Sequence, residues 1–149
     1  MVPGIPPWHA YCIEGAMPKG MHILLADDET AFRFSASIAL RGAGYRVSVA
    51  RNGREAFSRI VKARDAGDPV RVLVTDQQMP EMTGLELISL LREEGIRIPI
   101  VVVSAYADPP GVPGSQHGDI RELIEKPIEP GALVACLKRV SVSGAGRPA

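Results

Sequence analysis

The sequence predicts an α/β fold in which a five-stranded parallel sheet is covered by helices on both faces. Short apolar runs recur along the chain and alternate with stretches whose apolar residues repeat at helical spacing. Most of the runs are apolar at nearly every position, which is typical of parallel strands buried on both faces. Ionisable residues follow three of the runs. Because the carboxyl ends of parallel strands share one edge of a sheet, we expect these residues to lie together.

Length and charge narrow the class of protein. A chain of 149 residues suits one domain, and the 17 basic residues equal the 17 acidic ones, so no basic field favours nucleic-acid binding. No charge-poor stretch reaches the ~18 residues of a membrane span. Cys12 and Cys136 have neither a disulfide nor a metal-binding spacing. We therefore expect a cytoplasmic protein that neither binds nucleic acid directly nor inserts into a membrane.

The strands are predicted from apolar runs bounded by turn or helix signals. The first run, His-Ile-Leu-Leu-Ala, precedes the acidic stretch that begins at Asp27, and the third precedes Asp76. The fifth run is shorter and precedes Lys126. The five predicted strands cover residues 22–26, 45–50, 70–75, 98–103 and about 122–125.

Four helices are predicted between and after these strands. The first follows Glu29 and ends near Gly42 and Gly44, because glycine commonly ends helices. The other three follow Gly53, Gly84 and Pro130. The apolar stripes of the four helices, in chain order, are Phe32, Ala36, Ala39, Leu40 and Ala43; Phe57, Ile60 and Val61; Leu87, Ile88 and Leu91; and Leu133, Cys136, Leu137 and Val140.

Three segments lack such patterns. Residues 108–118 contain three prolines and three glycines, and proline inside a helix costs about 3 kcal/mol, so we expect a loop in place of a helix between the last two strands. Residues 1–20, with four prolines and three glycines, are expected to form a disordered leader. Residues 142–149 are expected to form a flexible tail, which leaves 21–141 as the domain.

Four motifs occur in order at the predicted strand ends: Asp27-Asp28-Glu29, Asp76-Gln-Gln-Met-Pro with Gly84 behind it, Ser104-Ala105, and Lys126-Pro127. Together they resemble the receiver domain of bacterial two-component response regulators, over about residues 21–140. The resemblance implies a flavodoxin-like, doubly wound sheet with strand order 2-1-3-4-5. In this chain the fourth helix of that fold is expected to be degenerate or replaced by the Pro/Gly loop.

Asp76 is the candidate phosphoacceptor. An aspartate could simply open the turn before Met79-Pro80, but a carboxylate at a strand end can also act as the nucleophile toward a phosphoryl group. Lys126 could be a surface lysine, or it could neutralise charge on the phosphoryl oxygens. The resemblance implies the second role, a cis Lys126-Pro127 peptide, and a hydrogen bond from the Ser104 hydroxyl to the phosphoryl group.

The adjacent acids indicate a metal site. Asp27 and Asp28 could merely favour the start of a helix, but acids gathered beside Asp76 would repel one another unless a cation joined them. Mg²⁺ accepts such oxygen ligands. The resemblance implies direct coordination by Asp28, Asp76 and the backbone carbonyl of Gln78, with Asp27 acting through water. Glu29 is expected to be a helix-start charge.

Several positions depart from the family pattern. Leu123 stands where the family often has an aromatic switch residue, and Tyr106 could partly substitute for it. Gln78 stands at a position that helps to set the aspartyl-phosphate lifetime in the family. Phe34 and Ile38 lie off the apolar stripe of the first helix, as either additional core or a docking surface for a partner helix.

The function predicted from these features is that of a stand-alone receiver. It would take a phosphoryl group from a histidine kinase or histidine phosphotransfer protein onto Asp76, with Mg²⁺, and then signal to an unidentified downstream protein through altered contacts. It would be a signalling domain rather than an enzyme. The alternative is a degenerate receiver that binds partners without phosphorylation. An aspartate-nucleophile phosphatase is disfavoured because no second Asp lies two residues beyond Asp76.

Overall fold

Five parallel strands form one sheet in the order β2-β1-β3-β4-β5. The computed structural model describes residues 20–105 and 119–145. The predicted parallel sheet and its order are confirmed. The strands are β1 (His22–Ala26), β2 (Arg46–Ala50), β3 (Val72–Asp76), β4 (Ile100–Ser104) and β5 (Ile120–Glu125).

Some strand ends differ from the predicted ranges. Val70 and Ile98 belong to the predicted runs, but β3 begins at Val72 and β4 at Ile100. Val70 is nevertheless buried, because apolar patterns follow burial rather than pairing between strands. At the other edge, β5 begins two residues before its predicted start. Its register with β4 shifts after the pair Ile100–Ile120, which leaves Arg121 as an extra residue in β5.

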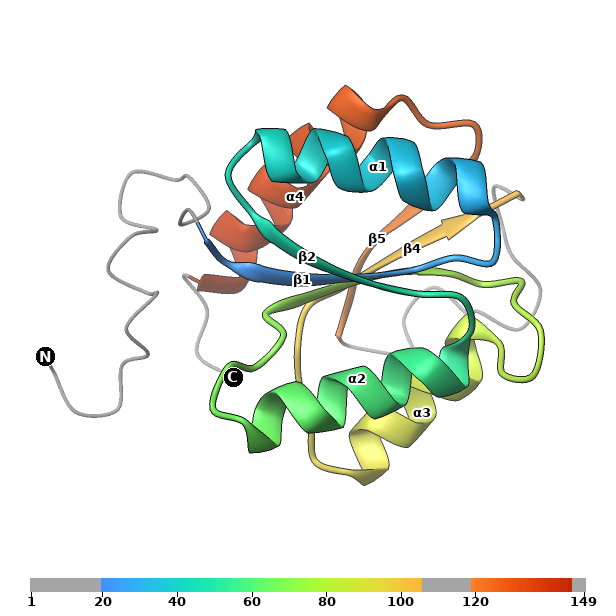
Figure 1. Ribbon diagram of the computed structural model, residues 1–149, viewed down its shortest axis with the longest axis vertical. Helices are drawn as coiled ribbons and strands as arrows, with labels where there is room; N and C mark the ends of the chain where they lie inside the picture. Colours follow the sequence, from blue (N-terminus) through green and yellow to red (C-terminus); the bar gives the residue numbers. More distant parts are fainter. Residues whose placement is uncertain (1–19, 106–118, 146–149) are drawn as a thin grey trace, which may run out of the picture.

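Helices cover both faces of the sheet (Figure 1). Helices α1 (Thr30–Gly42) and α4 (Pro130–Ala145) lie on one face, and α2 (Gly53–Asp65) and α3 (Gly84–Glu93) lie on the other. Among the described residues no helix lies between β4 and β5. The predicted Pro/Gly loop, Tyr106 and the predicted leader up to residue 19 lie outside the described residues. Helix α4 continues to Ala145, so residues 142–145 are helical rather than part of the expected tail.

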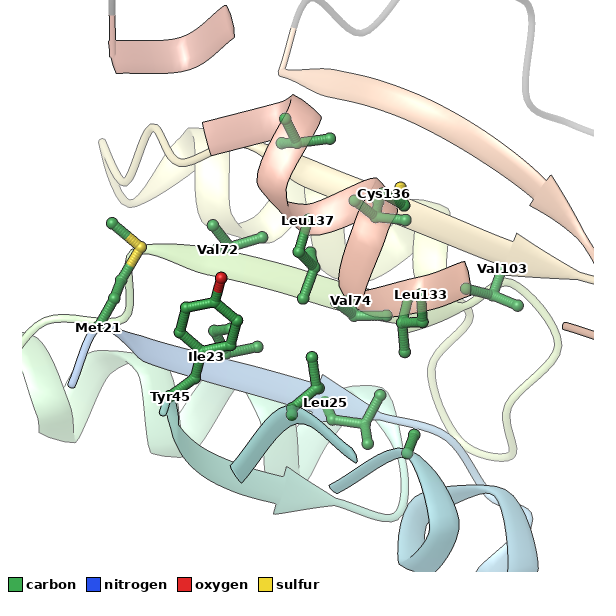
Figure 2. Packing of buried hydrophobic residues seen from close by; sticks show 14 residues of the cluster. Met21, Ile23, Leu25, Tyr45, Val72, Val74, Val103, Leu133, Cys136 and Leu137 are labelled. Carbon is green, nitrogen blue, oxygen red and sulfur yellow. The ribbon is translucent and has the colours of Figure 1, made fainter. Parts of the chain in front are cut away.

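Two apolar layers separate the sheet from its helices. The layer between the sheet and α1 and α4 includes Leu25, Val74 and Leu137, which point toward one another from different elements (Figure 2). The layer on the α2 and α3 side includes Leu24, Leu73 and Leu87. Both layers are fully closed at these residues, whose exposed fractions are 0–1 %. The strand ends are therefore fixed by packing on both faces.

The second apolar pair of α1 does not add to this core. The exposed fractions of Phe34 and Ile38 are 68 % and 54 %. Additional core is therefore the wrong explanation for these two residues. Leu123 on β5 is also partly exposed. Within the ranges 20–105 and 119–145, no helix is long and apolar enough to cross a membrane.

Candidate functional site

Three carboxylates meet at the carboxyl edge of the sheet. Asp27 and Asp28 follow β1, and Asp76 is the last residue of β3, which pairs directly with β1. One oxygen from each carboxyl group lies within 4.8 Å of the other two. Asp27 and Asp76 are buried, whereas Asp28 is exposed. The sheet thus brings together the acids that the sequence placed at separate strand ends.

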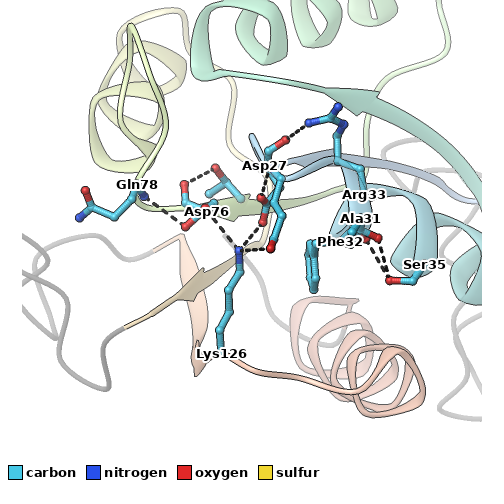
Figure 3. Close-up of polar contacts among 10 residues, drawn as sticks. Asp27, Ala31, Phe32, Arg33, Ser35, Asp76, Gln78 and Lys126 are labelled. Atoms are coloured by element: carbon cyan, nitrogen blue, oxygen red, sulfur yellow. Dashed lines mark hydrogen bonds and ion pairs between the residues drawn. The ribbon is translucent and has the colours of Figure 1, made fainter.

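The Asp76 carboxylate is held from two sides. Its Oδ1 accepts a hydrogen bond from the backbone N–H of Gln78 at 3.1 Å, and its Oδ2 lies 3.4 Å from Lys126 Nζ (Figure 3). Burial, followed by the negative charge of Asp27, raises the pKa of Asp76 above its ordinary value despite these two contacts. This carboxylate is therefore less stable as an anion than an exposed aspartate.

Asp27 is fully enclosed, and its charge is balanced by Lys126. Its Oδ2 lies 2.7 Å from Lys126 Nζ, and its Oδ1 accepts a hydrogen bond from the backbone N–H of Glu29 at 2.8 Å. Arg33 of α1 donates to the Asp27 main-chain carbonyl at 2.6 Å. Asp28 stands beside this fixed group with its side chain toward solvent. The arrangement leaves Asp28 as the acid of the cluster that faces outward.

Lys126 reaches the acids from the far edge of the sheet. The Lys126-Pro127 peptide is cis, as the resemblance implied, and the Lys126 backbone N–H donates to the Ser104 carbonyl at 2.6 Å. The ammonium also lies 4.8 Å from the centre of the Phe32 ring and 3.8 Å from Glu29 Oε1. Burial acts to lower the pKa of Lys126, but the hydrogen bond and charge of Asp27 outweigh it, so the pKa is raised. Lys126 therefore stays protonated.

Ser104 and Gln78 occupy different surroundings at this edge. Ser104 is the last residue of β4 and is almost completely buried. In the sheet it is paired with Glu125 of β5. Gln78 follows Asp76 by two residues and is exposed. Its backbone N–H contacts the Asp76 carboxylate directly. The structure thus places the candidate acceptor, the candidate metal ligands, Ser104 and Lys126 around Asp76 or on a strand end beside it.

Sequence reasoning missed two residues at this site. Phe32 was assigned only to the apolar stripe of α1, but its ring face lies beside the Lys126 ammonium, an arrangement that attracts a cation to the ring. Gln77 was treated only as part of the motif around Asp76. It is buried, and its side chain contacts the first turn of α3. A long polar residue directly after a buried strand was the available signal for Gln77.

The donor chemistry of the cluster fits a hard divalent cation. The three acids supply oxygen atoms alone, and Mg²⁺ prefers carboxylate, carbonyl and water oxygens. One ammonium faces the three carboxylates, so the cluster keeps an excess of negative charge. The exposed Asp28 provides access from solvent. The residues present therefore fit Mg²⁺, which receiver domains bind in an acidic pocket.

Comparisons with known proteins agree with this fold. Residues 23–138 match the family described as "Response regulator receiver domain". The chain is 30 % identical over 121 residues to the two-component response regulator ORR3 of Oryza sativa subsp. japonica, covering 80 % of this chain and 89 % of that protein. It is 32 % identical over 117 residues to the transcriptional regulatory protein FixJ of Rhizobium meliloti, covering 78 % of this chain but only 55 % of FixJ.

A solved structure supports the same assignment. The chemotaxis response regulator CheY4 of Vibrio cholerae superposes with a TM-score of 0.68 at 31 % identity, covering 80 % of this chain and 97 % of that chain. The fold, the acidic edge and these similarities define a signalling domain of two-component systems. The chain belongs to the response regulator receiver family.

Proposed function

We propose that this protein accepts a phosphoryl group on Asp76 in a Mg²⁺-dependent reaction. The observation that carries the proposal is the convergence of three carboxylates and the Lys126 ammonium around Asp76. An acceptor needs a nucleophilic oxygen and a means to balance the charge that the phosphoryl group brings. This edge of the sheet supplies both, from residues up to 99 positions apart.

In the proposed step, a carboxylate oxygen of Asp76 forms a bond to phosphorus while the bond from phosphorus to a donor histidine nitrogen breaks. The electron pair of the broken bond stays on the imidazole, and the product on Asp76 is an acyl phosphate. Asp76 must be ionised to attack, and the positive charges beside it, Lys126 and a bound Mg²⁺, would favour the carboxylate anion. Lys126 neutralises negative charge at the acceptor.

Mg²⁺ would be held by Asp28, Asp76 and the backbone carbonyl of Gln78, with Asp27 acting through water. When bound, it neutralises charge on the acceptor and the phosphoryl oxygens. The Gln78 backbone N–H already orients Oδ1 of Asp76. Ser104 is the proposed donor of a hydroxyl hydrogen bond to the phosphoryl group. Its position at the end of β4, next to β3, supports this role.

The proposed phosphoryl donor is a histidine kinase or a histidine phosphotransfer protein, the partners of the receiver family. We propose that output follows from altered contacts of the receiver itself. The match to ORR3 spans 89 % of that protein and the match to CheY4 spans 97 % of that chain, whereas FixJ extends well beyond the matched part. Output through contacts of the receiver itself needs no attached effector domain.

The test is phosphorylation with acetyl phosphate and Mg²⁺, read by intact mass. Wild type should gain one phosphoryl mass, and Asp76→Asn should gain none. Asp68→Asn is the matched control. Asp68 is an acid that lies near the amino ends of the strands, away from Asp76, so this variant should label like wild type. A wild type that gains no mass, while remaining folded, would identify the degenerate, phosphorylation-independent receiver instead.

A further inference from the structure

The first turn of α3 takes two of its hydrogen-bond acceptors from Gln77, the residue that follows Asp76. The Gln77 main-chain carbonyl accepts from the backbone N–H of Gly84 at 3.1 Å, and its side-chain Oε1 accepts from the backbone N–H of Leu85 at 2.9 Å. The next N–H, of Glu86, bonds to Thr83 Oγ1 at 3.2 Å. Because the first N–H groups of a helix lack partners within it, Gln77 stabilises the start of α3.

The contact between the end of β3 and the start of α3 leaves no spare room. A Cβ atom on Gly84 would lie 2.6 Å from the Asp76 carbonyl oxygen and 3.0 Å from Gln77 Oε1. Gln77 itself is only 5 % exposed, and its backbone N–H donates to the Val103 carbonyl of β4. Gln77 is therefore fixed through its main chain and its side chain at once.

Gln77 stands in the chain between Asp76 and Gln78, and these two neighbours contact each other at the candidate phosphoacceptor. Gln78 follows it directly, and the Gln78 backbone N–H donates to Asp76 Oδ1 at 3.1 Å. The Gln78 carbonyl is the proposed third protein ligand of Mg²⁺. Because Asp76, Gln77 and Gln78 are consecutive, a rotation of the Gln77 backbone moves the Gln78 peptide group relative to the Asp76 carboxylate. The side-chain bond of Gln77 opposes that rotation.

We propose that Gln77 is a positioning residue for phosphoryl acceptance. By joining the end of β3 to the first turn of α3, Gln77 holds the Gln78 backbone N–H against the Asp76 carboxylate. It thereby also keeps the Gln78 carbonyl in place for the metal. The inference rests on the proposed function, because it assigns Gln77 a role in that same site. Gln77 acts through the backbone of Gln78 and not through contact with the reacting atoms.

The test compares two variants that each remove one acceptor from the same helix turn. Gln77→Met keeps the length of the side chain but cannot accept from Leu85, and Thr83→Ala cannot accept from Glu86. Gln77→Met should bind Mg²⁺ alone about three- to tenfold more weakly, the effect of about one hydrogen bond, and its Gln78 amide resonance should shift before metal is added. Thr83→Ala should lower the melting temperature and leave Mg²⁺ affinity unchanged. Equal Mg²⁺ affinity in both variants would overturn the inference.

A wild-type measurement carries the test if Gln77→Met does not fold. Coupling between sites is reciprocal, so Mg²⁺ with beryllofluoride, which stands in for the phosphoryl group on Asp76, should slow hydrogen exchange of the Leu85 amide about three- to tenfold. The Glu86 amide should change less. Equal slowing of both amides would overturn the role of Gln77 and leave the proposed function intact. A wild type that neither binds Mg²⁺ nor gains phosphoryl mass would overturn the proposed function and, with it, the role of Gln77.

Discussion

Charged clusters of opposite character lie at the two ends of the parallel strands. We call the side where the strands begin the amino edge and the side where they end the carboxyl edge. At the amino edge, Asp68 pairs with Arg46 through two contacts of 2.6 Å, and both side chains are about half exposed. The hydrogen bond from Arg46 lowers the pKa of Asp68. At the carboxyl edge, burial and Asp27 raise the pKa of Asp76. The first cluster is a satisfied surface ion pair, whereas the second retains repulsion that a cation relieves.

The difference indicates where charge is structural and where it is available for chemistry. A balanced, solvated pair adds little stability and responds little to ligands. A buried cluster with excess negative charge changes in free energy whenever its charge changes. Substitutions that alter charge should therefore have large effects at the carboxyl edge and small ones at the amino edge.

The largest effect is expected for Lys126→Met. Removal of the ammonium leaves Asp27 buried without its counter-charge and Asp76 beside it. We expect the free energy of unfolding at neutral pH to fall by about 2–4 kcal/mol, somewhat less than for a fully buried pair because Lys126 is partly exposed. Denaturant unfolding without Mg²⁺ measures this value. A loss below about 1 kcal/mol would show that Lys126 does not compensate the acids.

Asp76→Asn should act in the opposite direction. Because the pKa of Asp76 is raised in the folded protein, the folded state binds more protons than the unfolded state, and stability falls as the pH rises through the interval between the two pKa values. The neutral amide avoids this loss. Repulsion between charges within 4.8 Å predicts a gain of about 1–3 kcal/mol at neutral pH.

The pH dependence separates this explanation from improved packing. At about pH 3.5, below the ordinary aspartate pKa of about 3.9, the carboxyl group is mostly protonated in both states, and most of the advantage of Asp76→Asn should disappear. Thermal or denaturant unfolding at pH 7 and at pH 3.5 provides the comparison. An advantage that is equal at both pH values would contradict an electrostatic origin.

Mg²⁺ should stabilise the wild type by a smaller amount. A ligand that binds only the folded state adds about 1.4 kcal/mol at ten times its dissociation constant. Asp28→Ala should lose most of this increment, because Asp28 is the proposed direct ligand that faces solvent. Asp27→Ala should weaken Mg²⁺ affinity less than Asp28→Ala. Titration followed by NMR measures affinity, and equal affinity in Asp28→Ala and wild type would contradict the assignment.

The smallest effect is expected for Asp68→Asn at the amino edge. The lowered pKa of Asp68 means that its contribution to stability is present above the unfolded pKa and is lost as the pH falls through the folded value. For this half-exposed pair we expect a loss of about 0–1 kcal/mol at pH 7, reduced further by salt. A loss comparable with that of Lys126→Met would invalidate the contrast between the two edges.

Sequence reasoning identified the parts of the site that are set by strand ends. Asp27, Asp76 and Lys126 each follow a predicted strand, and parallel strands bring their carboxyl ends together, so their convergence was predictable. The strand order followed from the resemblance. Apolar patterns also identified the buried stripes of the helices, although they could not separate Val70, which is buried, from the residues paired in β3.

Contacts that depend on side-chain geometry were not predictable in this way. Helical spacing assigned Phe32 to the core, but its contact with Lys126 depends on how α1 lies relative to the end of β5. The acceptor role of Gln77 depends on the close approach of Gly84 to β3. The extra residue in β5, Arg121, arises from the register of the ladder with β4, which no local pattern encodes.

The contact between Lys126 and Asp27 closes a loop of 99 residues. Contacts of such long range carry a large loop-closure entropy, and β5 pairs with only one strand, β4, at the edge of the sheet. A chain whose last strand has not docked has the acids but lacks their ammonium. Under the proposed function, competence to take up a phosphoryl group would therefore depend on the docking of β5 and would arise only in a chain whose sheet is complete.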